Sequence, residues 1–240
     1  MEKRRIAKGH TNISFQADGF FVQEKVKTGL NHFTNYEVLA EFDFVPKLIE
    51  NTDQQSTWQW IEGQNLYEPC DQDLVNLAQI LLRIHGSKVK LAPFLLAQRI
   101  NAYRKNYQAK GLKIPIMEKV YRKINLILRN MDKSTPIHGD LWQENIIKTT
   151  TNKLFIVDWE YSHLGDLHFE LAYLIEALRL NEKQEKLFLA SYGNYNPEYL
   201  YKHKVLVQYI TILWLHTYDV LPFSDQEAIA KLTAFYEAGI

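Results

Sequence analysis

Cysteine is nearly absent from this chain: Cys70 is the only one among 240 residues. A single cysteine cannot form an intrachain disulfide, and it cannot build a zinc site that needs several thiolates. An excess of charge of one sign is missing as well, because 28 basic residues balance 28 acidic ones. A nucleic-acid-binding protein usually concentrates positive charge, so this balance argues against nucleic acid as a partner.

Long hydrophobic runs are also missing. The basic N-terminus is followed by no apolar segment of signal-peptide length. The longest apolar stretch, 205–215, is too short to cross a bilayer and is interrupted by Gln208 and Tyr209. From these absences we expect a soluble, cytoplasmic protein with no membrane partner, and the sequence indicates no obligatory protein partner.

Strand and helix patterns divide the chain into two parts. Segments 12–16 and 20–26 flank Asp18-Gly19, a typical hairpin turn pair. Further strands are predicted at 46–49 and 56–61, and a helix at 31–41. From Asp71 onward, apolar residues recur at three- and four-residue spacing, which predicts helices at 71–86, 94–109, 116–131, 167–180, 182–192, 197–220 and 224–238. We therefore expect an α+β chain with two lobes: a small antiparallel sheet in residues 1–62 and a helical lobe in residues 63–240.

The segment 137–172 carries the strongest chemical signal. Asp140 is followed after four residues by Asn145, and an apolar run then ends in Asp158. Phosphoryl transfer needs Mg²⁺ on the nucleotide and an acceptor hydroxyl aligned with the transferred group. Mg²⁺ prefers hard oxygen ligands, so we assign Asp158 and Asn145 to the metal. Asp140 remains as the general base, with Asn145 beside it. Either aspartate alone would more often be a turn or cap residue, but the ordered set favours catalysis.

This segment resembles the aminoglycoside phosphotransferase and choline kinase family, which shares the protein kinase fold. Within this segment, 158–161 (DWEY) with Gly165-Asp166 also resembles the family. Three other segments support the resemblance, which covers about residues 8–175: the opening 8–15 (KGHTNISF), the lobe-linking segment 58–63 (WQWIEG) and the helix end 81–85 (LLRIH). Their form is closest to bacterial thiamine and choline kinases. The resemblance implies a two-lobed, protein-kinase-like fold and ATP as the phosphoryl donor.

Nucleotide contacts follow from the same resemblance. The opening, which has a single glycine, Gly9, would cover the nucleotide through Thr11 and Asn12, and Trp60 and Glu62 would lie in the segment that contacts adenine.

A basic residue on strand 20–26 should bind the phosphates. We prefer Lys25 there, with Gln23 as the alternative. Its helix partner is assigned to Glu37, with Glu41 as the second choice. Glu170 stands where relatives usually carry aspartate, and a structural role is expected for it.

The acceptor is expected to be a small molecule with a hydroxyl group, because the chain lacks the activation segment of protein kinases. Glu160 beside the metal site would suit a cation, as would aromatic side chains, since each cation–π contact contributes ~0.5–2 kcal/mol. The aromatic candidates are Trp142, Trp214 and Tyr218. We rank thiamine first and choline or ethanolamine second. An aminoglycoside phosphotransferase and a nucleotide-binding pseudokinase remain as alternatives.

Overall fold

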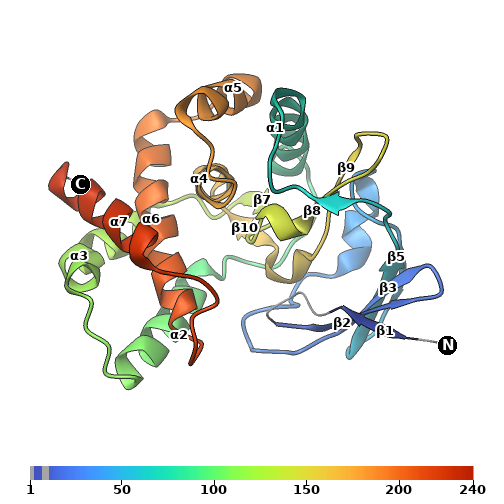
Figure 1. Cartoon of the computed structure of the whole chain (residues 1–240), viewed down its shortest axis with the longest axis horizontal. Coiled ribbons are helices and arrows are strands. Elements are labelled where there is room, and N and C mark those ends of the chain that lie inside the picture. The colour runs from blue at the N-terminus through green and yellow to red at the C-terminus, as the bar shows by residue number, and fades with distance from the viewer. Residues whose placement is uncertain (1–2, 7–10, 240) are drawn as a thin grey trace.

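The computed structural model describes residues 3–6 and 11–239, and its N-terminal part is one antiparallel sheet. Five strands lie in the order β1 (Arg4–Ile6), β2 (Ile13–Ala17), β3 (Phe20–Glu24), β5 (Gln55–Gln59) and β4 (Leu48–Asn51). Asp18 and Gly19 join β2 to β3 with φ values of 48° and 81°. Two left-handed residues in succession form the turn that matches the twist of a hairpin, so the predicted hairpin is confirmed. Figure 1 shows this sheet at one end of the molecule.

The helix predicted at 31–41 is wrong over its first half. Only η1 (Tyr36–Glu41), a short 3-10 helix, forms, and it begins where the Asn35 side chain accepts from the Glu37 amide. His32 has a φ of 58°, which is incompatible with a right-handed helix. This stretch is instead tied to residues far along the chain, because the His32 amide donates to the Glu160 carbonyl at 2.8 Å.

Seven helices make up most of the remaining described chain, as the apolar spacing predicts. They are α1 (Asp71–His85), α2 (Leu96–Ala109), α3 (Pro115–Asn130), α4 (Leu167–Ala177), α5 (Glu182–Tyr192), α6 (Pro197–Leu215) and α7 (Gln226–Glu237). The largest difference is at α6, which ends five residues before the predicted Val220. α1 packs on α5, and α4 packs on α6 (Figure 1). No helix of the described chain is long and apolar enough to cross a membrane.

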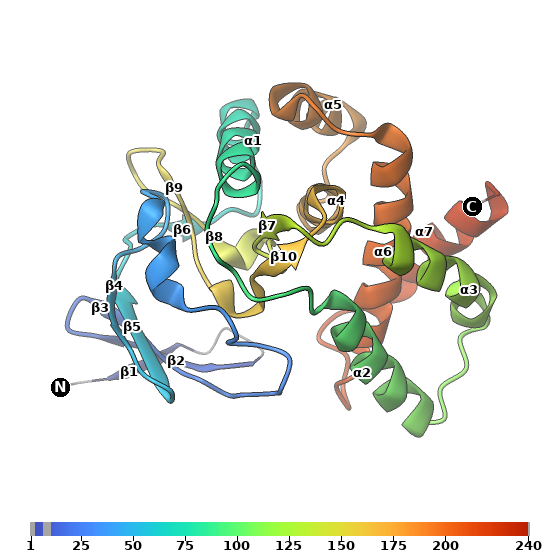
Figure 2. The ribbon, with the colours of Figure 1, turned by 180° about the vertical axis from the view of Figure 1, so that it is seen from behind.

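Two small sheets lie between the five-stranded sheet and the helices, as Figure 2 shows from behind. One pairs β7 (Thr135–Ile137) with β10 (His163–Gly165), and the other contains β6 (Gln64–Asn65), β8 (Ile146–Lys148) and β9 (Leu154–Ile156). Ile137, Ile146 and Ile156 are fully buried and anchor these strands. The strands fix both ends of the loop that carries Asp140 and the start of the turn that carries Asp158. The boundary expected at residue 62 falls between β5 and β6, and it stays a prediction.

Candidate active site

The loop after β7 is held at Gly139, the residue before Asp140. Gly139 has a φ of 79°, and a Cβ built there would lie 2.5 Å from the Tyr161 carbonyl oxygen. Its amide donates to Glu170 Oε1 at 2.9 Å, and its carbonyl accepts from Arg99 Nη2 at 3.1 Å. Glycine is required here because both the left-handed conformation and the close contact exclude a side chain.

Asp140 and Asn145 are brought together, as the Asp-x4-Asn spacing predicts. The Asn145 side chain, on η2 (Gln143–Asn145), donates from Nδ2 to the Asp140 carbonyl at 2.9 Å. Its Oδ1 is therefore left as the acceptor atom of the amide. The Tyr173 hydroxyl donates to Asp140 Oδ1 at 2.9 Å. The carboxylate of Asp140 is thus oriented by a side chain from α4 while its main chain is fixed by Asn145.

Asp158 follows β9 and opens η3 (Trp159–Tyr161) in the left-handed region, with φ 61° and ψ 64°. Aspartate tolerates this region better than most residues, and such conformations gather at functional sites. Gln23 Nε2 donates to Asp158 Oδ1 at 3.2 Å. Burial and then the negative charge of Asp140 raise the pKa of the Asp158 carboxyl, although the Gln23 bond opposes them. A buried carboxyl group with a second one near enough to shift its pKa supplies the hard oxygen atoms that suit Mg²⁺.

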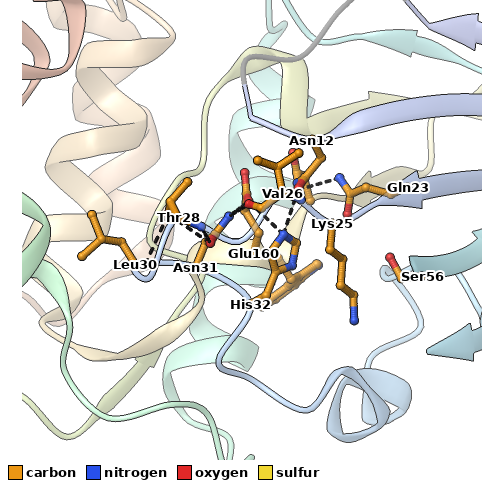
Figure 3. Close-up of polar contacts among 12 residues, drawn as sticks. Asn12, Gln23, Lys25, Val26, Thr28, Leu30, Asn31, His32, Ser56 and Glu160 are labelled. Carbon is orange, nitrogen blue, oxygen red and sulfur yellow. Dashed lines mark hydrogen bonds and ion pairs between the residues drawn. The ribbon is translucent and has the colours of Figure 1, made fainter. Parts of the chain in front are cut away.

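Glu160 is buried beneath the segment that joins β3 to η1 (Figure 3). Asn31 Nδ2 donates to its Oε2 at 2.6 Å, and His32 Nε2 lies 3.3 Å from the same oxygen. Asn12 Oδ1 lies 2.9 Å from His32 Nε2. Burial first and the charge of Asp158 second raise the pKa of the Glu160 carboxyl. Burial lowers the pKa of His32 to about 4, so its ring is neutral near pH 7.

The structure brings Gln23, and not Lys25, to Asp158. Lys25 Nζ donates to Asn51 Oδ1 and to the Thr52 carbonyl, both at 2.6 Å. Figure 3 shows its ammonium directed away from Glu160. Glu37 is exposed and contacts Asn35, so the ion pair expected between Lys25 and a helix glutamate is replaced by these contacts. The start of η1 does reach Lys25, whose Nζ lies 5.2 Å from the centre of the Tyr36 ring, but the next residue, Glu37, is exposed and contacts Asn35.

The predicted nucleotide residues lie beside strands of the five-stranded sheet, Thr11 and Asn12 just before β2 and Trp60 and Glu62 just after β5. Burial raises the pKa of the Tyr161 hydroxyl, and the Thr11 side chain acts on that hydroxyl in the opposite direction, which places the opening segment near the turn after Asp158. Trp60 follows β5, and its Nε1 donates to Glu62 Oε1 at 2.8 Å. The preceding residues Lys8, Gly9 and His10 lie outside the described part of the chain. The nucleotide roles of Thr11, Asn12, Trp60 and Glu62 stay predictions.

Aromatic side chains from α2, α4, η3 and the end of α6 gather near Asp140. Tyr218 is half-buried; its burial, followed by the charges of Tyr103, Asp140 and Glu160, raises its pKa to about 12. Trp214 packs edge-on against Tyr218, with ring centroids 5.4 Å apart. Trp142 lies in the loop itself, and its carbonyl accepts from the Asn145 amide. The structure therefore places the late aromatics Trp214 and Tyr218 on the Asp140 side of the site.

Arg99, Tyr103 and Tyr173 belong to the same site but were not predicted from the sequence. Arg99 sits on a helix stripe that is otherwise apolar, between Leu96 and Ile100, which are both buried. A basic residue on an otherwise apolar helix face indicates a charge with a specific buried partner, and this pattern can be read from the sequence. Tyr173 follows Glu170 by three residues on α4, so both face the Asp140 loop.

The oxygen donors fit Mg²⁺ with few protein ligands. Within the described residues, no three or more His, Cys, Asp or Glu side chains are placed to hold a metal ion. Mg²⁺ at phosphoryl-transfer sites keeps several waters and is bound by one or two carboxylates together with phosphate oxygens. Asp158 and the Asn145 amide oxygen match that donor chemistry.

Comparison with known proteins agrees with this geometry. A model of the phosphotransferase enzyme family matches residues 30–201. The chain belongs to this family. A protein of Metamycoplasma hominis named "Protein LicA homolog" is 41% identical, with 99% of this chain and 97% of that protein aligned. A protein of the same name from Mycoplasma capricolum subsp. capricolum is also 41% identical, with 99% of this chain and 96% of that protein aligned.

Solved structures show the same fold. Choline kinase LicA from Streptococcus pneumoniae superposes with a TM-score of 0.77 at 18% identity, covering 99% of this chain and 94% of that one. An ADP-bound aminoglycoside phosphotransferase superposes with a TM-score of 0.65 at 16% identity, covering 98% of this chain and 92% of that one. The phosphotransferase thus has the α+β, protein-kinase-like fold expected from its sequence.

Proposed function

We propose that this phosphotransferase transfers a phosphoryl group from ATP to the hydroxyl of choline. Thiamine ranked first from the sequence, but the comparisons favour choline. The relatives that align along the whole chain are named LicA homologs, and choline kinase LicA has the same fold. The observation that carries the proposal is the gathering of Tyr103, Tyr218 and Trp214 beside the carboxylates of Asp140 and Glu160.

A quaternary ammonium has no hydrogen-bond donor, so it is recognised by aromatic faces and by negative charge. The aromatic ring of Tyr218 and the carboxylate of Asp140 would supply both in this site. Asp140 and Glu160 act electrostatically on Tyr218, which indicates that the phenol and the carboxylates lie close together. Glu160 accepts from Asn31, and burial raises its pKa to about 8, so it is mostly neutral near pH 7 and we assign the negative charge beside the cation to Asp140.

The roles of the residues follow from their contacts. Asp140 accepts the proton of the choline hydroxyl as that oxygen attacks the γ-phosphate, and Tyr173 holds the accepting carboxylate in place through its 2.9 Å bond. Gly139, held from both sides, fixes the main chain before it. Asp158 and Asn145 would hold Mg²⁺, which neutralises the charge that develops on the phosphates.

A catalytic role is better supported than a pseudokinase role. Pseudokinases usually lack the base, the amide or the metal carboxylate, whereas Asp140, Asn145 and Asp158 are all present and adjacent in this chain. Gln23 lies beside Asp158, where the family would carry a basic residue, but this difference leaves the base, the amide and the metal carboxylate in place.

The test is ADP release from Mg-ATP with choline, ethanolamine, thiamine and kanamycin in parallel. We expect a saturable response to choline, with the largest kcat/KM of the four. A larger kcat/KM for thiamine or kanamycin would reassign the acceptor. No response to any of them, together with tight Mg-ADP binding, would support the pseudokinase alternative.

A further inference from the structure

Arg99 is a basic residue enclosed in the helical part of the protein. It lies on α2 and is 5% exposed, between the buried Leu96 and Ile100. Enclosing a guanidinium is costly unless charge and hydrogen-bond partners compensate for the lost water. The partners of Arg99 therefore indicate why it occupies this position.

Its partners all belong to the active site. Arg99 Nη2 donates to the Gly139 carbonyl at 3.1 Å, and the guanidinium carbon lies 4.7 Å from the centre of the Tyr161 ring. The negative charge of Asp140 also acts on Arg99. One side chain thus touches the main chain immediately before the base and an aromatic ring beside the acceptor region.

The contact with Gly139 has a counterpart of opposite charge. Glu170 Oε1 accepts from the Gly139 amide at 2.9 Å, while Arg99 donates to the carbonyl of the same residue. A buried anion and a buried cation therefore bind the two polar groups of one glycine. Glycine has no Cβ to limit its backbone, so these two hydrogen bonds help to hold Gly139 at its left-handed φ of 79°.

We propose that Arg99 is a positioning residue, which sets the place of Asp140 relative to the acceptor through the Gly139 carbonyl and the Tyr161 ring. The proposal rests on the proposed function only for the identity of the acceptor. A lysine keeps the charge but has no planar fork, so it cannot bind the carbonyl and stack on the ring at once. A displacement of about 1 Å at the reacting atoms costs roughly 100-fold in rate.

Arg104 provides a matched control on the same helix. It is 7% exposed, donates to the Tyr209 hydroxyl at 2.8 Å, and lies 3.7 Å from the centre of the Tyr121 ring. Like Arg99 it binds an oxygen and an aromatic ring, and it also pairs with Glu118, with Arg104 Nη2 3.0 Å from Glu118 Oε2; none of these partners belongs to the Asp140 loop. If Arg99 serves only to stabilise α2, the two arginines should respond alike to substitution.

The experiment compares Arg99→Lys and Arg104→Lys for kcat, KM of each substrate, Mg-ADP affinity by calorimetry, and thermal unfolding. We expect Arg99→Lys to lower kcat with choline at least 10-fold and to leave Mg-ADP affinity within about 2-fold. Arg104→Lys should keep kcat within about 2-fold even if it unfolds at a lower temperature. Equal losses of kcat in both variants, or an unchanged kcat in Arg99→Lys, would overturn the proposal.

Two additions keep the result independent of folding and of the acceptor. Arg99→Met has an apolar side chain of similar length, and it replaces Arg99→Lys if the lysine variant does not fold. Hydrolysis of Mg-ATP without any acceptor is measured in the same variants, because it depends on the Asp140 loop but not on the acceptor. If choline is the wrong acceptor, the wild type hydrolyses ATP without responding to choline, and the effect of Arg99 is still read from hydrolysis.

Discussion

Shortening Glu170 by one carbon should weaken the whole protein, although the negative charge is kept. Its two oxygens bind groups on different elements: Oε1 accepts from the Gly139 amide at 2.9 Å, and Oε2 lies 3.0 Å from His85 Nε2 on α1. Aspartate is shorter by one carbon–carbon bond, about 1.5 Å, so it cannot keep both contacts from the same position on α4.

The magnitude follows from the loss of one hydrogen bond to a buried charge, about 1.5–3 kcal/mol. For a chain of this size each kcal/mol lowers the melting temperature by about 2–4 °C, so Glu170→Asp should melt roughly 3–12 °C below the wild type. Glu170→Ala removes the anion altogether and should cost about 3–5 kcal/mol. Calorimetric or urea unfolding measures both.

Glu176→Asp on the same helix is the control. Glu176 Oε2 accepts from Lys231 Nζ at 2.9 Å and from Gln208 Nε2 at 2.8 Å. Both partners are long, flexible side chains that can follow a shorter carboxylate, so we expect a loss below about 1 kcal/mol. If Glu170→Asp is as stable as Glu176→Asp, the carboxylate does not hold Gly139 and α1 together, and the reasoning about Gly139 fails with it.

The same carboxyl predicts a dependence on pH. Burial would raise the pKa of Glu170, but the bonds from His85 and Gly139 and the nearby charges of His85 and His138 outweigh burial and hold it below the usual 4.5. Its contribution is therefore fully present above about pH 4.5 and is lost as the pH falls below that value. The difference in unfolding free energy between wild type and Glu170→Ala should shrink in that acid range, and a constant difference would contradict the pKa direction.

Three further substitutions test the site. Gly139→Ala places a Cβ 2.5 Å from the Tyr161 carbonyl oxygen at a left-handed φ, so kcat should fall at least 10-fold, whereas Gly111→Ala, also left-handed but in open space, should leave kcat unchanged. Asp158→Asn should weaken Mg-ADP binding by calorimetry at least 10-fold, and an unchanged affinity would remove Asp158 from the metal site. Lys25→Gln should leave the KM for ATP within about 2-fold, because the Lys25 ammonium is bound to Asn51 and Thr52. Gln23→Leu should raise the KM for ATP, because Gln23 lies beside Asp158. A raised KM in Lys25→Gln with an unchanged KM in Gln23→Leu would restore Lys25 as the phosphate-binding residue.

Local patterns predicted much of this structure. The Asp18-Gly19 turn, the seven helices and the adjacency of Asp140 and Asn145 depend on residues close in sequence, and the structure has all of them. The Asp-x4-Asn loop was readable because the amide that fixes Asp140 lies five residues away on the same loop.

Long-range contacts explain what the sequence did not show. The helix expected from residue 31 is absent because Asn31 and His32 are held by Glu160, more than a hundred residues away. Lys25 continues the alternation of β3, but Asn51 and Thr52 on the neighbouring turn bind its ammonium. Arg99 showed only as a charge on an apolar stripe, since its partner Gly139 lies 40 residues along the chain.

The most direct test of the account is whether the protein makes phosphocholine from Mg-ATP and choline, followed by phosphorus NMR, with Asp140→Asn as the comparison. The account predicts a phosphomonoester signal that grows with time in the wild type and is at least 100-fold slower in Asp140→Asn, whose Mg-ADP affinity stays within about 2-fold of wild type. Equal rates in the two proteins, or ATP consumption without phosphocholine, would contradict it.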